Sequence, residues 1–149
     1  MEFYKGKYRV PDGAVNTFVM CVTGEAAENG VPLVEGIIFD NGPYPVLSDF
    51  TGTIDESGMN FTKKYRNSIP EQKSPIQYNL VKLANDRRYL GFYHMGKTCK
   101  QAYRKGTVYL EKANIDEIIG NISLSNIRVD EFKPGEIPVV LDLIKRNKL

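Results

Sequence analysis

The stretch FTGTIDESGMNFTKKY, residues 50–65, decides the fold class of this chain. Apolar side chains alternate with polar ones on both sides of its centre, and this period of two is typical of half-buried antiparallel strands. The centre is Asp55-Glu56-Ser57-Gly58, where Asp caps its own backbone and Gly accepts a positive φ. The stretch therefore predicts a β-hairpin, with one strand around Phe50 and Ile54 and the next from Met59 to Tyr65.

The same alternation recurs along most of the first 112 residues. With Phe3–Val10 included, eight strands are predicted, and the other seven follow the stripes Phe18–Val22, Leu33–Phe39, Val46–Ile54, Met59–Tyr65, Ile76–Leu80, Tyr89–Tyr93 and Val108–Leu110. Further tight turns are expected at 40–43 and 85–86, and longer loops at Gly24–Gly30, Asn67–Pro75 and Gly96–Lys105. Short strands joined by local hairpins indicate an up-and-down sheet, and closing eight strands removes the unpaired edges. We expect a mainly β protein, an eight-stranded antiparallel up-and-down barrel, with a sandwich as the alternative.

The segment after residue 112 has a different pattern. Ile115–Ile119 suits one helical turn and Ile122–Val129 an additional strand, while Pro138 suits the first turn of a short helix. We expect residues 1–149 to form a single domain, with the barrel at 3–112 and a C-terminal appendage at 113–149 that carries this short helix.

Composition excludes several classes of protein. The chain has 149 residues, 42% of them hydrophobic, and its apolar runs are too short to span a bilayer. Charged side chains interrupt the first twenty residues, which argues against a signal peptide. We therefore expect a soluble cytoplasmic protein that does not enter a membrane.

Catalytic and metal chemistry find little support in the residue types. Two cysteines and a single histidine, His94, make neither a disulfide framework nor a zinc site, and they leave no nucleophile–base set. The acids Asp40, Asp49, Asp55 and Glu56 fall at strand ends and turns, where capping explains them. We predict no metal, no cofactor and no catalytic residue, although the sequence alone leaves an enzyme open.

Several glycine–aromatic motifs point to a family resemblance. They are Phe50-x-Gly52, Gly58-x-x-Phe61-x-Lys63-x-Tyr65, Ile76-x-Tyr78, Tyr89-x-Gly91-x-Tyr93 and Gly106-x-Val108-x-Leu110. Together they resemble the strand signature of calycin-like barrels, the lipocalin and avidin-like domains, and Gly6-Lys7-Tyr8 stands where lipocalins open with Gly-x-Trp. The resemblance covers roughly residues 3–112 and implies a barrel with an interior cavity. The chain departs from these families in having no Trp, so the resemblance implies no particular ligand.

A lysine in an otherwise apolar and aromatic stripe is the first candidate site. If Phe61 and Tyr65 point inward, strand parity sends Lys63 inward as well. A buried ammonium needs a carboxylate partner or an anionic ligand; alternatively, Lys63 reaches water from the barrel mouth. We expect a non-catalytic barrel that holds a small amphipathic or anionic molecule in its interior. The predicted lining is Phe61, Lys63, Tyr65, Tyr78 and Tyr93.

The charge distribution is the second candidate feature. The net charge is only +2, yet residues 1–58 carry a balance of −6 and residues 59–112 one of +9. The basic run consists of Lys82, Arg87, Arg88, Lys97, Lys100, Arg104 and Lys105, interleaved with tyrosines. Cations beside aromatic rings can hold phosphates and stack bases, whereas hairpin tips also carry cations simply because they face water. The alternative function is thus an interaction module whose basic hairpins at 82–105 dock an acidic protein or a nucleic acid. The sequence fits a monomer or a homodimer and leaves open whether Cys99, between two lysines, is reactive.

Overall fold

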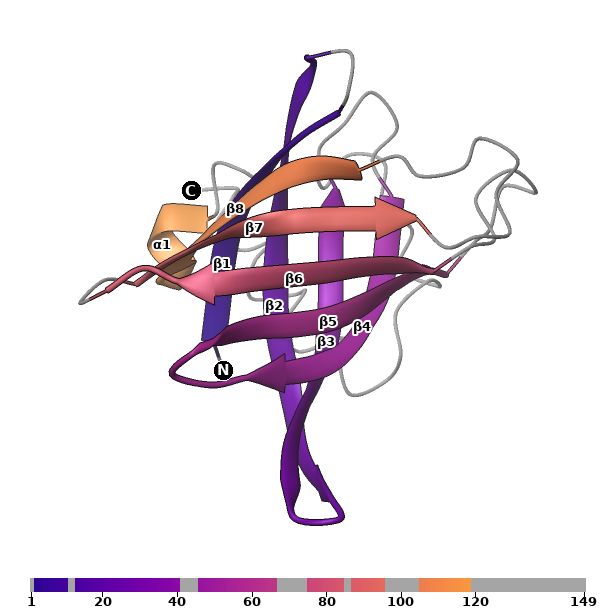
Figure 1. Ribbon diagram of the computed structural model, residues 1–149, viewed down its shortest axis with the longest axis vertical. Helices are drawn as coiled ribbons and strands as arrows, with labels where there is room; N and C mark the ends of the chain where they lie inside the picture. Colours follow the sequence, from indigo (N-terminus) through magenta and orange to yellow (C-terminus); the bar gives the residue numbers. More distant parts are fainter. Residues whose placement is uncertain are drawn as a thin grey trace.

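The computed structural model describes residues 2–10, 13–40, 46–66, 75–84, 87–95 and 105–118. Its elements are β1 (Glu2–Arg9), β2 (Val15–Glu28), β3 (Val31–Asp40), β4 (Val46–Ile54), β5 (Gly58–Tyr65), β6 (Ile76–Lys82), β7 (Arg88–Met95), β8 (Lys105–Ala113) and α1 (Ile115–Ile118). Each strand pairs antiparallel with the next, and β8 pairs with β1, which closes the barrel. In Figure 1, β5–β7 cross β1–β3 at a steep angle, as opposite walls of this barrel. The predicted eight-stranded up-and-down barrel is confirmed.

The hairpin at residues 50–65 forms as predicted. Ile54 of β4 pairs with Met59 of β5, and the carboxylate of Asp55 accepts hydrogen bonds from the backbone N–H groups of Ser57 and Gly58 at 2.8 and 3.1 Å. The side chain of Asp55 therefore satisfies backbone donors that the reversal leaves without strand partners. The capping by Asp55 is thus as predicted, but the expected positive φ at Gly58 is wrong. Glycine stands there because a Cβ would collide with the backbone carbonyl of Leu80 on β6.

The predicted loop at Gly24–Gly30 is wrong. β2 continues through Glu28, pairs with β3 as far as Val31, and reverses at Asn29-Gly30. Both turn residues have positive φ, 52° and 79°, which is the backbone of a two-residue hairpin turn. The hairpin extends beyond the barrel body (Figure 1), so its residues form a ladder without contributing much to the interior.

The interior of the barrel is lined by alternate residues of every strand. The buried cluster contains aromatic side chains from six strands, including Tyr4, Phe18, Phe50, Phe61 and Tyr78. Three inward glycines lie under large rings of a neighbouring strand, and an added Cβ would collide with that ring; these pairs are Gly6 with Phe18, Gly36 with Phe50 and Gly106 with Tyr93. Rings and glycines thus alternate around the wall because the barrel cross-section has room for one large side chain per pair.

The described chain ends at α1, a single helical turn begun by Asn114, whose side-chain oxygen accepts a hydrogen bond from the N–H of Glu117 at 3.0 Å. This is the helical turn predicted from residue 115 onward. The predicted strand at 122–129 and the helix after Pro138 lie outside the described residues. Within the described ranges, no helix has the length and apolar character needed to cross a bilayer.

Candidate functional site

All five residues predicted to line the interior face into the barrel. Strand register places Phe61 opposite Tyr78, and Tyr78 opposite Tyr93, in one row across β5, β6 and β7. The rings of Phe61 and Tyr78 are stacked, with centroids 4.5 Å apart, and Tyr78 lies 5.9 Å from Tyr93. These three side chains are buried, whereas Tyr65 is half-buried at the end of β5. The middle of the barrel is therefore packed with rings, and the predicted polar group lies nearer one end.

Lys63 is buried and paired with a carboxylate. Its Nζ lies 2.6 Å from Oδ2 of Asp40, and the two side chains are only 2% and 4% exposed. The amine therefore points inward rather than to water, and its charge is compensated by the chain itself. The interpretation of Asp40 as a turn-capping acid does not describe its role, because its carboxylate is the partner of a lysine two strands away.

The ammonium is also surrounded by tyrosine rings. Nζ of Lys63 lies 4.7 Å from the ring centroid of Tyr65 and 6.0 Å from that of Tyr78. A cation over an aromatic face gains electrostatic stabilisation, and the gain is larger where water is excluded. Tyr65 thus covers the buried ion pair on the side of the barrel mouth.

Burial alone would lower the pKa of Lys63. Neighbouring oxygens outweigh burial and hold this pKa well above its ordinary value; they belong to Tyr78, Asp40 and Tyr65. Burial raises the pKa of Tyr78 above its usual range and that of Tyr8 to about 12, so both phenols stay protonated at neutral pH. The carboxylate of Asp40 is consequently the charge that compensates the ammonium, and a protonated Lys63 is no nucleophile.

Two buried oxygens beside this pair have no hydrogen-bond partner in the described part of the chain. They are Oδ1 of Asp40 and Oγ of Ser48, whose side chain is fully buried. Ser48 of β4 lies opposite Tyr65 on one side and opposite Ile38 on the other, so Asp40 and Lys63 are its diagonal neighbours on the inner face. A buried oxygen without a partner costs about 1–3 kcal/mol, and such groups in native proteins call for an explanation.

These groups define the candidate site, which we call the polar end of the barrel: Tyr8, Asp40, Ser48, Lys63 and Tyr65. Of these residues, Lys63 and Tyr65 are among those predicted from the sequence, and Tyr8, Asp40 and Ser48 are not. The signal for Ser48 was its parity with Phe50 on β4, and the signal for Tyr8 was its place in Gly6-x-Tyr8. Tyr8 and Tyr65 are half-buried, and both interact electrostatically with Asp40 and Lys63.

A separate hollow of about 740 Å³ opens at the opposite end of the barrel. Its floor includes the buried rings of Tyr4 and Tyr89, which meet edge to face at 6.0 Å, and its rim carries charges of both signs. None of the five predicted lining residues contributes to it. Lys82 and Arg87 of the predicted basic run do.

The basic run is only partly within the described residues. Lys82 is exposed at the end of β6, Arg87 in the turn that follows, and Arg88 at the start of β7. Lys97, Lys100, Arg104 and Cys99 lie outside the described residues, and of Lys105 only the backbone is described. His94 is half-buried on the outer face of β7, next to the inward Tyr93. Among the described residues, no group of three or more His, Cys, Asp or Glu side chains is arranged to hold a metal ion.

Because the phenols of Tyr78 and Tyr8 are buried, we expect the free energy of unfolding to fall steeply at alkaline pH. Unfolded tyrosines ionise near pH 10 and folded Tyr78 and Tyr8 above it, so between these values only the unfolded chain releases protons. Lys63 acts in the same direction, because its stabilising charge is complete below about pH 10.5 and is lost as pH rises through the higher folded value. We expect the free energy of unfolding to fall by about 1.4 kcal/mol per pH unit for each such group above pH 10.

Urea unfolding at about pH 8, 10 and 11 measures this slope. Tyr78→Phe removes one ionisable group and is expected to flatten the decline by about 1.4 kcal/mol per pH unit. A stability that does not change between pH 10 and 11 would contradict the burial of these phenols.

Comparison with known proteins adds no family. No family model, curated protein or solved structure matches this chain. The barrel is compatible with a calycin-like fold, and membership of that family stays a prediction.

Proposed function

We propose that the barrel binds one small amphipathic molecule in its interior, at the polar end, without changing it chemically. The observation that carries this proposal is the pair of buried oxygens without partners, on Asp40 and Ser48, beside an ion pair that is already complete. A ligand with a hydroxyl or amide group would supply the missing hydrogen bond. Its apolar part would lie against the tyrosine rings.

The ion pair decides between the two ligand chemistries that the sequence suggests. Asp40 already occupies the ammonium of Lys63 at 2.6 Å, so an anionic ligand would compete with an internal carboxylate and bring a second negative charge close to it. A neutral ligand that donates a hydrogen bond meets no such competition, because the Oδ1 atom of an ionised Asp40 can accept that bond. A neutral amphipathic molecule therefore fits the site better than an anion.

Tyrosine contacts supply the apolar half of the recognition. Tyr8 meets Tyr93 edge to face at 5.8 Å, and Tyr65 covers Lys63. Small-molecule sites typically combine such aromatic walls with a few polar groups that fix orientation. Tyr8 and Tyr65 are half-buried, so their rings are the parts of this site nearest to solvent.

Thermal-shift screening with two matched sets of small molecules tests the proposal. Neutral alcohols and amides with an apolar body are expected to raise the melting temperature more than carboxylates of the same size. For each neutral hit, Ser48→Ala is expected to weaken binding by about three- to tenfold, the worth of one hydrogen bond. Without ligand, this variant should be as stable as the wild type or up to about 1 kcal/mol more stable, because it removes an unsatisfied hydroxyl.

Thr51→Ala is the control, since it removes an exposed hydroxyl from the outer face of the same strand. It should leave ligand binding unchanged. Carboxylates that bind better than neutral molecules, or hits that Ser48→Ala does not weaken, would refute the proposed site.

A further inference from the structure

The outer face of β7, β8 and β1 carries an ordered set of side chains that the interior site does not use. Strand pairing arranges them in two rows, each running from β7 across β8 to β1. The first row is Phe92, Thr107 and Arg9, and the second is Leu90, Tyr109 and Lys7. Each row thus begins with an apolar side chain and ends with a cation. We call these six residues the outer strip.

The apolar part of the outer strip is unusually exposed. Phe92 is 61% exposed and Leu90 46%, and Val81, which pairs with Leu90 from β6, is 63% exposed. Phe92 and Tyr109 are diagonal neighbours on the same face, since Phe92 lies opposite Thr107. Two aromatic residues therefore occupy neighbouring positions on an outer face, where neither belongs to the interior cluster.

The cationic part follows β1. Lys5, Lys7 and Arg9 alternate along this strand, so successive cations are about 7 Å apart along the strand. Lys5 is partly neutralised by Glu111 and Glu117, at 4.0 and 3.9 Å. In the described ranges Lys7 and Arg9 enter no ion pair.

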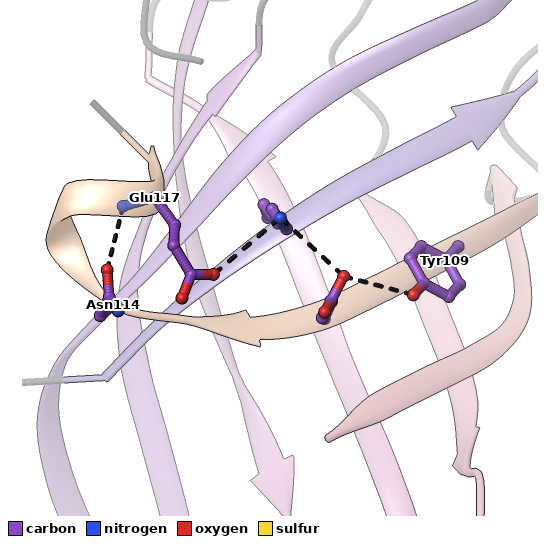
Figure 2. Close-up of polar contacts among 5 residues, drawn as sticks. Tyr109, Asn114 and Glu117 are labelled. Atoms are coloured by element: carbon purple, nitrogen blue, oxygen red, sulfur yellow. Dashed lines mark hydrogen bonds and ion pairs between the residues drawn. The ribbon is translucent and has the colours of Figure 1, made fainter. Parts of the chain in front are cut away.

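Figure 2 shows the polar contacts of the acidic side chains near the outer strip. Tyr109 and Glu117 are the two ends of a chain of polar contacts that crosses β8 and β1, and Asn114 fixes the backbone of Glu117. The hydroxyl of Tyr109 donates to Glu111 at 3.4 Å, and Glu111 also contacts Lys5. The carboxylates of Glu111 and Glu117 therefore both contact Lys5, which lies nearer to α1 than Lys7 and Arg9 do.

A hollow of about 440 Å³ adjoins the second row. Its lining includes Lys7, Tyr109 and Thr17, together with Gly6 of β1. A ring edge, a cation and a hydroxyl thus converge on one depression in an outer sheet face.

Closure of the barrel places the acidic and the basic segments of the sequence on different parts of its wall. Between residues 13 and 58, which contain β2–β4, seven acids and no Lys or Arg occur. The basic strands β5–β8 continue into β1, because β8 pairs with β1. The outer strip lies within this basic wall.

We propose that the outer strip binds single-stranded nucleic acid, with phosphates along Lys7 and Arg9 and bases stacked on Phe92 and Tyr109. Proteins that bind single strands without sequence preference combine two features. Cations contact the phosphate backbone of the nucleic acid, and aromatic rings stack on the bases, whichever bases these are. An acidic peptide would use the cations alone and leave both rings in water. This inference is independent of the ligand proposed for the interior.

Fluorescence anisotropy with a labelled oligothymidylate tests the proposal. Binding is expected to weaken linearly with the logarithm of salt concentration, and Phe92→Ala should weaken it by about fivefold or more at fixed salt. Replacing Lys7 and Arg9 together with Gln should lower the magnitude of the salt slope by about 1.4, which is two phosphate contacts. Glu111→Gln should instead strengthen binding, because it removes a carboxylate beside the strip and leaves Lys5 with Glu117 as its remaining acidic partner.

Lys64→Gln and Val31→Ala are the matched controls, an exposed cation on β5 and an exposed apolar side chain at the distant hairpin. Neither should change the affinity by more than about twofold. The proposal fails if the oligothymidylate does not bind at low salt, or if Lys64→Gln weakens binding as much as the joint replacement of Lys7 and Arg9. It also fails if poly-glutamate binds as tightly as the oligothymidylate and Phe92→Ala has no effect, because the partner is then an acidic protein.

Discussion

Replacement of Lys63 with methionine is expected to lower the free energy of unfolding by about 3–5 kcal/mol. Methionine fills a similar volume but removes the ammonium, and Asp40, 4% exposed, would then keep an uncompensated charge inside the barrel. Both carboxylate oxygens would lack a partner, since Oδ1 has none in the described chain already. Urea unfolding at neutral pH measures the loss.

A double variant separates the cost of a broken pair from the value of the pair. Lys63→Met with Asp40→Leu removes both charges, and the free energy of unfolding should return to within about 2 kcal/mol of the wild type or exceed it. The resulting coupling energy belongs to the pair alone if the two single variants fold. The adjacent Lys64→Met, an exposed side chain, should change the free energy of unfolding by no more than about 0.5 kcal/mol. If Lys63→Met costs no more than this control, the ion pair does not form in solution.

This expected cost bears on function. A buried ion pair is weak evidence for stability, because well-packed apolar side chains of similar size usually stabilise a core at least as well. The barrel nevertheless places such a pair beside two oxygens without partners, at the end where Tyr8 and Tyr65 approach solvent. The ligand proposed above would give these oxygens a partner, which packing of the described residues does not.

The strands of the barrel could be predicted because their signals are local. Alternation over five to eight residues requires only one buried face of the strand. The turn after β4 is also a local signal, because the side chain of Asp55 accepts a hydrogen bond from the backbone of its own turn. The glycine–aromatic motifs could be listed from the sequence, but the reason for each glycine depends on strand pairing. Gly6 and Gly106 lie under a ring of the neighbouring strand, whereas a Cβ on Gly52, Gly58 or Gly91 would collide with neighbouring backbone.

The partner of Lys63 could not be predicted because it depends on how the barrel closes. Asp40 and Lys63 are 23 residues apart and come from β3 and β5, with β4 between them. Parity was ambiguous on β3, since Ile37 and Phe39 of its outer face are as buried as Ile38 of its inner face. A strand buried on both sides gives no alternation from which to assign Asp40 to the interior.

The missed turn at Asn29-Gly30 has a different cause. Small and polar residues from Gly24 to Gly30 resemble a loop in composition, yet Asn-Gly is a strong signal for a two-residue hairpin. The ladder continues there because backbone hydrogen bonds between β2 and β3 do not need buried side chains. Composition alone therefore predicts an end of β2 that is too early, whereas the turn chemistry of Asn29-Gly30 indicates the observed one.

Gly36→Ala is expected to lower the free energy of unfolding by about 3 kcal/mol, the upper end of the cost of overpacking a core. A Cβ on Gly36 would collide with the backbone carbonyl of Cys21 on β2 and lie 2.7 Å from the ring of Phe50 on β4. A backbone atom held in a ladder cannot turn aside as a side chain can, so β2 and β3 would have to separate.

Gly24→Ala on β2 is the matched control for this prediction. There a Cβ would meet only the flexible side chain of Glu35, at 3.1 Å from Oε1, which can move into solvent. Alanine also reduces the conformational freedom of the unfolded chain, so this variant should stay within about 1 kcal/mol of the wild type. Urea midpoints of the two variants, measured side by side, give the comparison. Equal effects would mean that β2 and β3 are not held as closely as the contact of Gly36 with Cys21 requires, and the wall that carries Asp40 would lose its rigid support.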